Sequence, residues 1–161
     1  MRTNTFLKSC LQGFLEDQFA DKPVENRLTI AFGRRAKRRF GSIKMDRQGK
    51  ESWITINGVF RDERIPQQII YATVAHELCH YAHGFCSPLK KKYKYPHQSG
   101  VVSRELKKRG LHHLSEYEKI WTKNNWPKVL EREFPRQAKR RVRRRVGRKS
   151  GLKLVLDLLK P

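Results

Sequence analysis

The chain of 161 residues lacks the features that mark membrane, secreted and disulfide-stapled proteins. No apolar run approaches the roughly 20 residues needed to cross a bilayer, which excludes a membrane-spanning protein. The three cysteines, Cys10, Cys79 and Cys86, include no CxxC pair and argue against a disulfide framework or a cysteine zinc finger. Polar residues interrupt the apolar ones between residues 6 and 15, unlike in a secretory signal. We therefore expect a chain that is not secreted and resides in the cytoplasm or with the nucleoid or nucleus.

Acidic residues are also scarce, with 15 Asp and Glu against 37 Lys and Arg, a formal net charge of +22. Such an excess of positive charge destabilises a compact fold by self-repulsion. It is typical of proteins with a polyanionic partner, above all nucleic acid. We predict three basic clusters that bind nucleic acid without reading its sequence. The first consists of Arg34, Arg35, Lys37, Arg38 and Arg39, the second of Lys90, Lys91, Lys92 and Lys94, and the third of Lys139, Arg140, Arg141, Arg143, Arg144 and Arg145.

The spacing of apolar residues predicts an α+β fold with helices around a small sheet. Residues spaced by helical turns predict helices at 5–20, 66–84, 97–109 and 114–133. Three β-prone stretches, at 27–32, 39–45 and 52–60, predict a three-stranded antiparallel meander. We expect an extended protein substrate to pair with the edge of the 52–60 strand.

The composition changes abruptly near residue 135, which predicts two parts of the chain. Residues 1–134 form the expected folded domain. Residues 135–161 form a basic tail, which holds the third cluster and then an apolar segment at 152–159. A targeting or anchoring signal is a second interpretation of the tail.

An HExxH motif lies inside the predicted helix at 66–84, with His76, Glu77 and His80 as its defining residues. Four residues advance a helix by about 400°, so the two imidazoles project from one face, about 6 Å apart along the axis. Two imidazoles so placed can bind one Zn²⁺ ion, and Glu77 on the flank can reach a water molecule there without being a ligand. The arrangement is typical of zinc-dependent hydrolysis, with the glutamate as general base and acid.

A third metal ligand has to come from elsewhere in the chain. His97 fits best, because it follows Pro96 and starts a new helix after a loop that is long enough to fold back. His83 fits poorly, since it lies about 10 Å from His76 along the helix axis. Glu105, His112 and His113 are further candidates for this position.

The segments TVAHELCHYAHG (residues 73–84) and PHQSGVVSRELKKRG (residues 96–110) together resemble the SprT-like metalloprotease domain. The upstream run RRFGSI…WITINGVF is similar to the small sheet of that family. The resemblance covers about two-thirds of the chain and implies a minimal zincin-like fold, here without the C-terminal zinc ribbon of many relatives. It also implies that His76, His80 and His97 are zinc ligands and that Glu77 is catalytic.

Relatives of the Spartan type cleave proteins bound or crosslinked to DNA, so the resemblance implies a substrate of this kind. The leading hypothesis is a zinc metalloendopeptidase with one Zn²⁺ ion that acts on DNA- or other nucleic-acid-associated proteins. The competing hypothesis is a non-catalytic nucleic-acid-binding protein in which a fourth ligand, such as His112 or Cys86, closes a structural zinc site.

Overall fold

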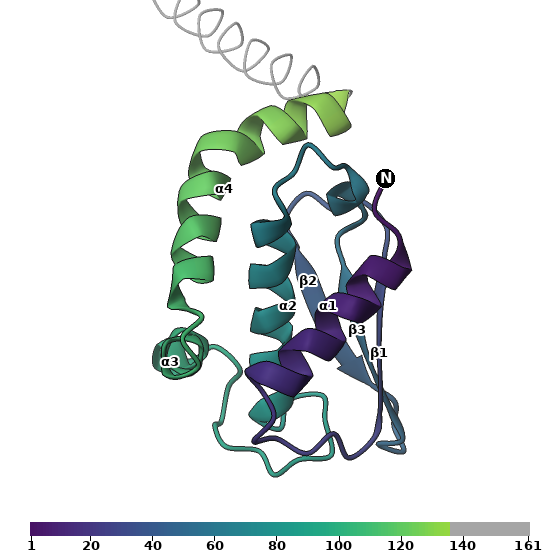
Figure 1. The fold of residues 1–161 in the computed structure, drawn as a ribbon, viewed down its shortest axis with the longest axis vertical. Helices are drawn as coiled ribbons and strands as arrows, with labels where there is room; N and C mark the ends of the chain where they lie inside the picture. Colours follow the sequence, from purple (N-terminus) through teal and green to yellow (C-terminus); the bar gives the residue numbers. More distant parts are fainter. Residues whose placement is uncertain (136–161) are drawn as a thin grey trace, which may run out of the picture. The chain divides into compact units, whose positions relative to one another are not determined.

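A computed structural model describes residues 1–135, which form four α-helices and a three-stranded mixed sheet (Figure 1). The expected α+β class and the expected order of helices and strands are confirmed. The elements are α1 (Asn4–Asp17), β1 (Arg27–Phe32), β2 (Gly41–Met45), β3 (Glu51–Ile56), the 3-10 turn η1 (Gly58–Arg61), α2 (Gln67–Ala82), the 3-10 turn η2 (Gln98–Gly100), α3 (Val101–Lys108) and α4 (His112–Glu133).

The chain divides into two compact units, Met1–Trp121 and a second that begins at Thr122, inside α4. The sheet, the first three helices and the HExxH motif all belong to the first unit. The predicted basic tail lies outside the described residues, so the boundary at residue 134 stays a prediction. No helix within residues 1–135 is both long and apolar enough to cross a membrane.

The sheet is mixed, and the predicted antiparallel meander is wrong. Its strand order is β1-β3-β2, with β1 parallel to β3 and β2 antiparallel to β3. The connection at residues 33–40 carries the chain from β1 at one edge of the sheet to β2 at the other edge. Strand β3 then lies between β1 and β2. The expected edge at residues 52–60 is therefore also wrong, because β3 is hydrogen-bonded on both sides and its end, residues 58–61, turns into η1.

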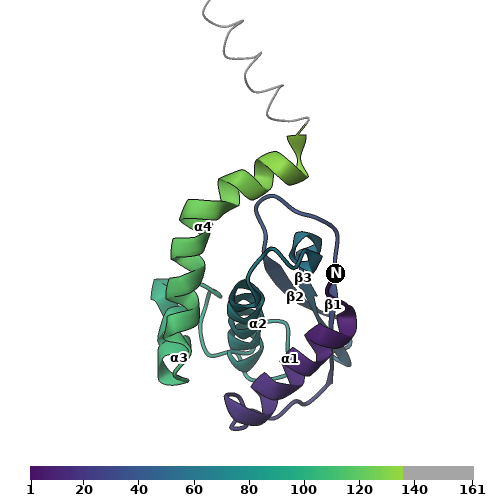
Figure 2. The same cartoon turned by 45° about the horizontal axis from the view of Figure 1, so that its top comes forward.

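One face of the sheet is covered by α1 and α2 (Figure 2). Side chains alternate along β3, so Ser52, Ile54 and Ile56 are buried on the helix side, while Trp53 and Thr55 face the other way and are half-buried. Helix α1 packs on β1, and α2 lies against β2, β3, α1 and α3. This central position explains why α2 is buried around most of its circumference.

The predicted helix at 97–109 begins later than expected. Ser99 and Gly100, the last two residues of η2, have positive φ values of +49° and +71°, and this kink precedes the start of α3 at Val101. A non-glycine residue in this left-handed region is uncommon and marks a sharp turn. His97 consequently lies ahead of both helical pieces, at the end of a loop.

Candidate metal centre

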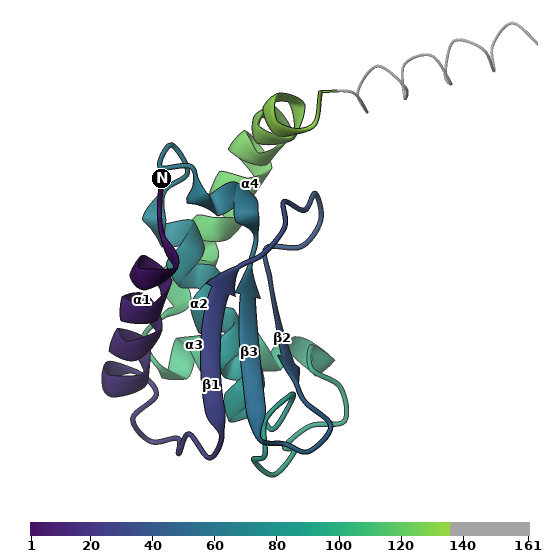
Figure 3. The same cartoon turned by 90° about the vertical axis from the view of Figure 1, so that its right-hand side faces the viewer.

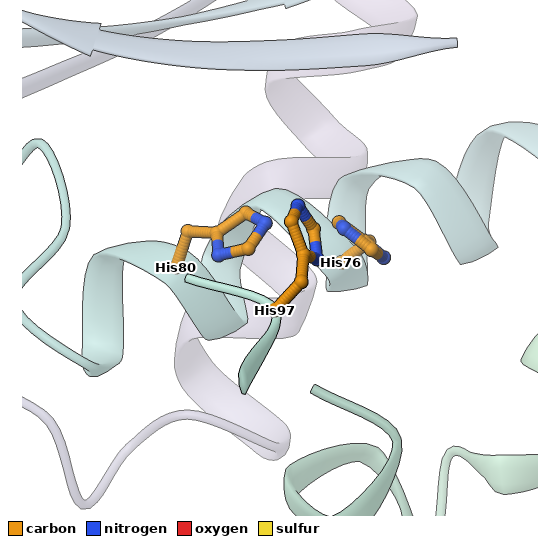
Figure 4. Close-up of side chains that lie close together, drawn as sticks. All are labelled: His76, His80 and His97. Carbon is orange, nitrogen blue, oxygen red and sulfur yellow. The ribbon is translucent and has the colours of Figure 1, made fainter. Parts of the chain in front are cut away.

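The first two imidazoles of the centre come from α2. His76 and His80 are one helical turn apart, and their ring centroids lie 4.8 Å from each other. Both side chains project from the same side of the helix (Figure 4). This part of the expected geometry follows directly from the 3.6-residue repeat of the helix.

The third imidazole is carried back to α2 by a loop that is fixed at several points. Gly84 ends α2 with a φ of +78°, and a Cβ atom there would lie 2.6 Å from the carbonyl oxygens of Leu89 and Lys90. Ser87 Oγ donates to Tyr81 O at 2.7 Å, and Lys92 N donates to His83 O at 3.0 Å. The loop is thereby tied to the end of α2 and returns His97 towards the other two rings.

The three rings converge on one point. The His97 centroid lies 5.3 Å from that of His76 and 4.6 Å from that of His80, and one nitrogen from each ring lies within 4.8 Å of the other two (Figure 4). The three histidines are thus close enough to hold one metal ion. Nitrogens that share a tetrahedral zinc ion at about 2.0–2.1 Å lie roughly 3.4 Å apart. The rings therefore have to come closer together, and the exposed His97 side chain can rotate towards the other two.

The electrostatics of the cluster suit a metal ligand set. Burial, helped by the neighbouring His97, lowers the pKa of His76 to about 4, and burial with the surrounding imidazoles lowers the pKa of His80 to about 3. Both rings are therefore neutral at pH 7 and keep a lone pair for a metal. In addition, the buried His80 Nδ1 has no hydrogen-bond partner among the described residues. Both ring nitrogens of His83 likewise lack a hydrogen bond within residues 1–135, so the mutual approach of the three rings is the feature that marks the centre.

Glu77 follows His76 on α2, and its side chain lies against Gly41, the first residue of β2. Its side chain is buried, with 6% of its surface exposed. A Cβ atom at Gly41 would lie 2.8 Å from Glu77 Oε1 and 2.6 Å from Thr73 Cγ2, so only glycine lets the strand approach the helix this closely. Burial raises the pKa of Glu77 to about 7, although the Arg39 charge and the Ile43 backbone oppose the rise.

A second carboxyl acts on Glu77, and the sequence pattern does not single it out. Burial raises the pKa of Glu118, in the first part of α4, to about 7, and its charge contributes to the raised pKa of Glu77. Glu118 falls among the polar residues of an amphipathic pattern, and nothing in that pattern separates a partly buried glutamate from an exposed one.

His83 and Glu105, two of the candidates for the third ligand, pair with each other instead. His83 is fully buried, and its Nε2 lies 3.4 Å from Glu105 Oε2. The other Glu105 oxygen lies 2.7 Å from Arg109 Nη2, and Arg109 Nη1 lies 2.7 Å from Asp21 Oδ1. This ion network joins α2, α3 and the segment after α1, and it is separate from the three-histidine cluster.

His112, His113 and Cys86 also lie outside the cluster. The two histidines are exposed at the start of α4, and Cys86 is exposed in the loop after α2. Within residues 1–135, the group formed by His76, His80 and His97 is the one set of three or more His, Cys, Asp or Glu side chains close enough to share a metal ion.

The predicted basic clusters are found in loops where the structure describes them. The first cluster occupies the β1–β2 connection, where Arg34, Arg35, Arg38 and Arg39 are exposed and Lys37 is half-buried. The four lysines of the second cluster are exposed in the loop that leads to His97, where Lys91 Nζ lies 4.9 Å from the centroid of the Phe85 ring. The third cluster and the apolar segment at 152–159 lie outside the described residues.

Comparison of the chain with protein-family models, with curated proteins and with solved structures found no match. A function for the chain therefore has to rest on the chemistry of its own residues.

Proposed function

We propose that this chain is a zinc-dependent metalloendopeptidase of zincin-like fold that acts on proteins associated with DNA or other nucleic acid. The observation that carries the proposal is the convergence of His76, His80 and His97 beside the buried Glu77. Neutral nitrogen ligands favour zinc over magnesium or calcium, which prefer oxygen. The resemblance of the motif segments to the SprT-like domain supports the same assignment.

In this proposal the three histidines hold zinc and Glu77 transfers protons. Zinc bound there would supply Lewis acidity to a water molecule and to the scissile carbonyl. Glu77 accepts the proton of the attacking water on its carboxylate and later gives it to the departing amine. A carboxyl with a pKa of about 7 suits both transfers near neutral pH, because it exchanges a proton in either direction at little cost.

Three protein ligands favour a catalytic zinc site over a structural one. Structural zinc is almost always held by four protein side chains, whereas catalytic zinc keeps one position open. Among residues 1–135, no fourth His, Cys, Asp or Glu joins the three histidines within ligand distance. Glu77, which follows His76 on α2, is the carboxyl proposed to act beside the open coordination position.

The strand proposed to receive an extended substrate is β2 rather than β3. Within the described residues β2 pairs with no strand other than β3, so its outer edge is open to a further strand, and one β2 backbone group, that of Ile43, bonds to Glu77. Gly41 places the start of this strand directly against Glu77. A substrate chain paired with the edge would run past the proposed catalytic group, with an affinity that comes from backbone hydrogen bonds and is independent of sequence.

The charge of the chain supports a nucleic-acid partner for the substrate. Exposed lysines and arginines of the first and second clusters can neutralise phosphates, and the second cluster lies in the loop that leads to His97. Nucleic acid bound near the metal centre would raise the local concentration of any protein attached to it.

The test uses the zinc-loaded full chain and a basic protein substrate, with and without DNA. Wild type should cleave the substrate, with DNA increasing the rate. Glu77→Gln should keep its zinc, measured by elemental analysis, and lose at least about 100-fold in kcat/KM. Glu116→Gln, which removes an exposed carboxyl of α4, is the matched control. Cleavage by the Glu77→Gln variant at the wild-type rate would refute the proposal.

A further inference from the structure

A cavity of about 240 Å³ opens on the side of the sheet that faces away from α2. Figure 3 shows the sheet from this side, with β3 between β1 and β2. The cavity is lined by residues of the β1–β2 connection, β2 and β3. Its walls include three cations and two aromatic rings, from Arg34, Arg39, Lys44, Phe40 and Trp53, and no carboxylate.

The sheet register places the central aromatic ring beside a cation. Trp53 of β3 is paired with Lys44 of β2, and Thr55 with Ser42. Directly paired residues on antiparallel strands point to the same face, with Cβ atoms about 5 Å apart. The Trp53 indole and the Lys44 ammonium group therefore lie on the same face of the sheet as Ser42 and Thr55, and all four residues line the cavity.

The basic connection above this surface is held in place by one buried side chain. Asn57, with 4% of its surface exposed, donates from Nδ2 to Ala36 O at 2.7 Å and to Arg39 O at 2.8 Å. Its Oδ1 accepts from Ala36 N at 3.1 Å, and its backbone N donates to Phe40 O at 2.7 Å. Gly58 N also donates to Arg34 O. The cationic loop is consequently preorganised, which lowers the entropy lost when it binds a ligand.

We propose that this cavity binds single-stranded nucleic acid, with one base stacked on Trp53 and the adjoining phosphates held by Arg34, Arg39 and Lys44. The inference rests on the nucleic-acid partner of the proposed function. It adds where that partner binds and that the bound nucleic acid is single-stranded. A volume below the roughly 300 Å³ typical of small-molecule sites suits one flat group rather than a whole cofactor. A base can stack on a protein ring only when it is free of a duplex partner, whereas every single-stranded base has an open face.

The position of the cavity connects it with the metal centre. Gly41 lines the cavity and also touches Glu77, and the charge of Arg39 acts on the Glu77 carboxyl. A strand held in the cavity would thus lie beside the beginning of β2, the edge proposed for the protein substrate. Protein attached to single-stranded nucleic acid would be delivered to that edge in preference to protein on intact duplex.

The test measures binding of a labelled oligothymidylate and of a duplex of equal length to the full chain by fluorescence anisotropy, over a series of salt concentrations. Trp53→Thr, which puts a β-branched residue in the strand, should weaken single-strand binding about 5- to 150-fold, the range for loss of one stacked base. Its duplex binding and its salt dependence should be unchanged. Trp53→Phe should restore most of the affinity, because phenylalanine keeps a ring.

Charge variants test the phosphate contacts separately. Lys44→Ala should reduce the slope of log K against log salt by about 0.7, the value for one phosphate contact on a single strand. Lys50→Ala, which removes a lysine outside the cavity, and Tyr117→Ala, which removes an exposed ring on α4, are matched controls. An oligouridylate of the same length distinguishes RNA from DNA as the source of the strand.

Two results would overturn the site. One is single-strand binding by folded Trp53→Thr as tight as that of wild type, and the other is an equal loss of single-strand and duplex affinity. Because the assay needs no cleavage, the proposed function is judged independently. If the chain binds as expected but cleaves no protein, the nucleic-acid site is supported and the peptidase proposal is refuted. If the chain cleaves protein but Trp53 has no effect on binding, the peptidase proposal is supported and the nucleic-acid site is refuted.

Discussion

Helix α2 carries two clusters of polar side chains, and they differ in how their charges are matched. Near its end, His83 meets Glu105, Glu105 meets Arg109, and Arg109 meets Asp21. One turn earlier, His80 faces His76 and His97, and within the described residues no carboxylate joins these three rings within ligand distance. The first cluster alternates acids and bases, whereas the second brings three bases together.

The difference indicates what each cluster is for. Three imidazoles that face one another gain no pairing of opposite charges, and their nitrogens are close enough to hold one metal ion. The network of alternating charges instead fastens α3, which follows His97, to α2 and to the segment after α1. One cluster has the properties of a binding site, and the other has those of a structural tie.

The largest expected effect is a difference between the two clusters in their contribution to zinc affinity. His97→Ala should lower zinc affinity at least about 100-fold, because it removes one of three ligands, more than the 10- to 100-fold of a supporting residue. His83→Ala should bind zinc but lose about 2 to 4 kcal/mol of unfolding free energy, since it empties a fully buried site. Zinc titration and denaturant unfolding of both variants measure the two quantities. Equal loss of zinc affinity in the two variants would contradict the distinction between the clusters.

How far the sequence predicts this arrangement depends on the range of the interactions involved. His76 and His80 converge because of a local helical repeat, so their placement could be predicted from spacing alone. His97 could be predicted because Pro96 and the preceding loop indicate a reversal of the chain. In each case the relevant signal lies within a few residues of the group that it positions.

The strand order could not be predicted in this way. It depends on the 33–40 connection, which Asn57 holds across about twenty residues of sequence. Alternating apolar residues identify a strand but do not identify its neighbours, so a meander is the default when three strands follow one another. Gly41 and Glu118 could not be recognised for a related reason, because their roles come from what lies opposite them in space.

A smaller effect separates two carboxyls, Glu118 near Glu77 and Glu105 in the ion network, by the sign of their pH dependence in the metal-free chain. Burial raises the pKa of Glu118 to about 7 from an unfolded value near 4.5, so the folded state holds an extra proton between these pH values. Stability is therefore lost as the pH rises through this window, and Glu118→Gln should gain about 3 kcal/mol relative to wild type between pH 4.5 and 7.

Glu105 should behave in the opposite way. Burial alone would raise the pKa of Glu105, but Arg109 and His83 lower it overall. Its contribution to stability is present above the unfolded pKa and is lost as the pH falls. Glu105→Gln should consequently be most destabilising near pH 7 and least so in acid. Denaturant unfolding of the two variants over pH 3 to 8 measures both trends, and parallel curves would show that the two carboxyls do not differ as described.

The smallest effect concerns the contact between β2 and Glu77 and is measured against a glycine that has no such contact. Gly41→Ala should cost about 1 to 2 kcal/mol, because its methyl group would meet Thr73 Cγ2 at 2.6 Å and Glu77 Oε1 at 2.8 Å in a packed interior. Gly13→Ala in α1 has open space within 4 Å and should stabilise the chain by about 0.5 to 1 kcal/mol, since alanine favours the helix. Because the displaced atom at Gly41 belongs to the proposed catalytic group, Gly41→Ala should also lower kcat/KM, whereas Gly13→Ala should leave it unchanged. Thermal unfolding and cleavage assays of the pair separate the two roles: a Gly41→Ala variant that loses stability but keeps full activity would mean that the strand supports the fold without positioning Glu77.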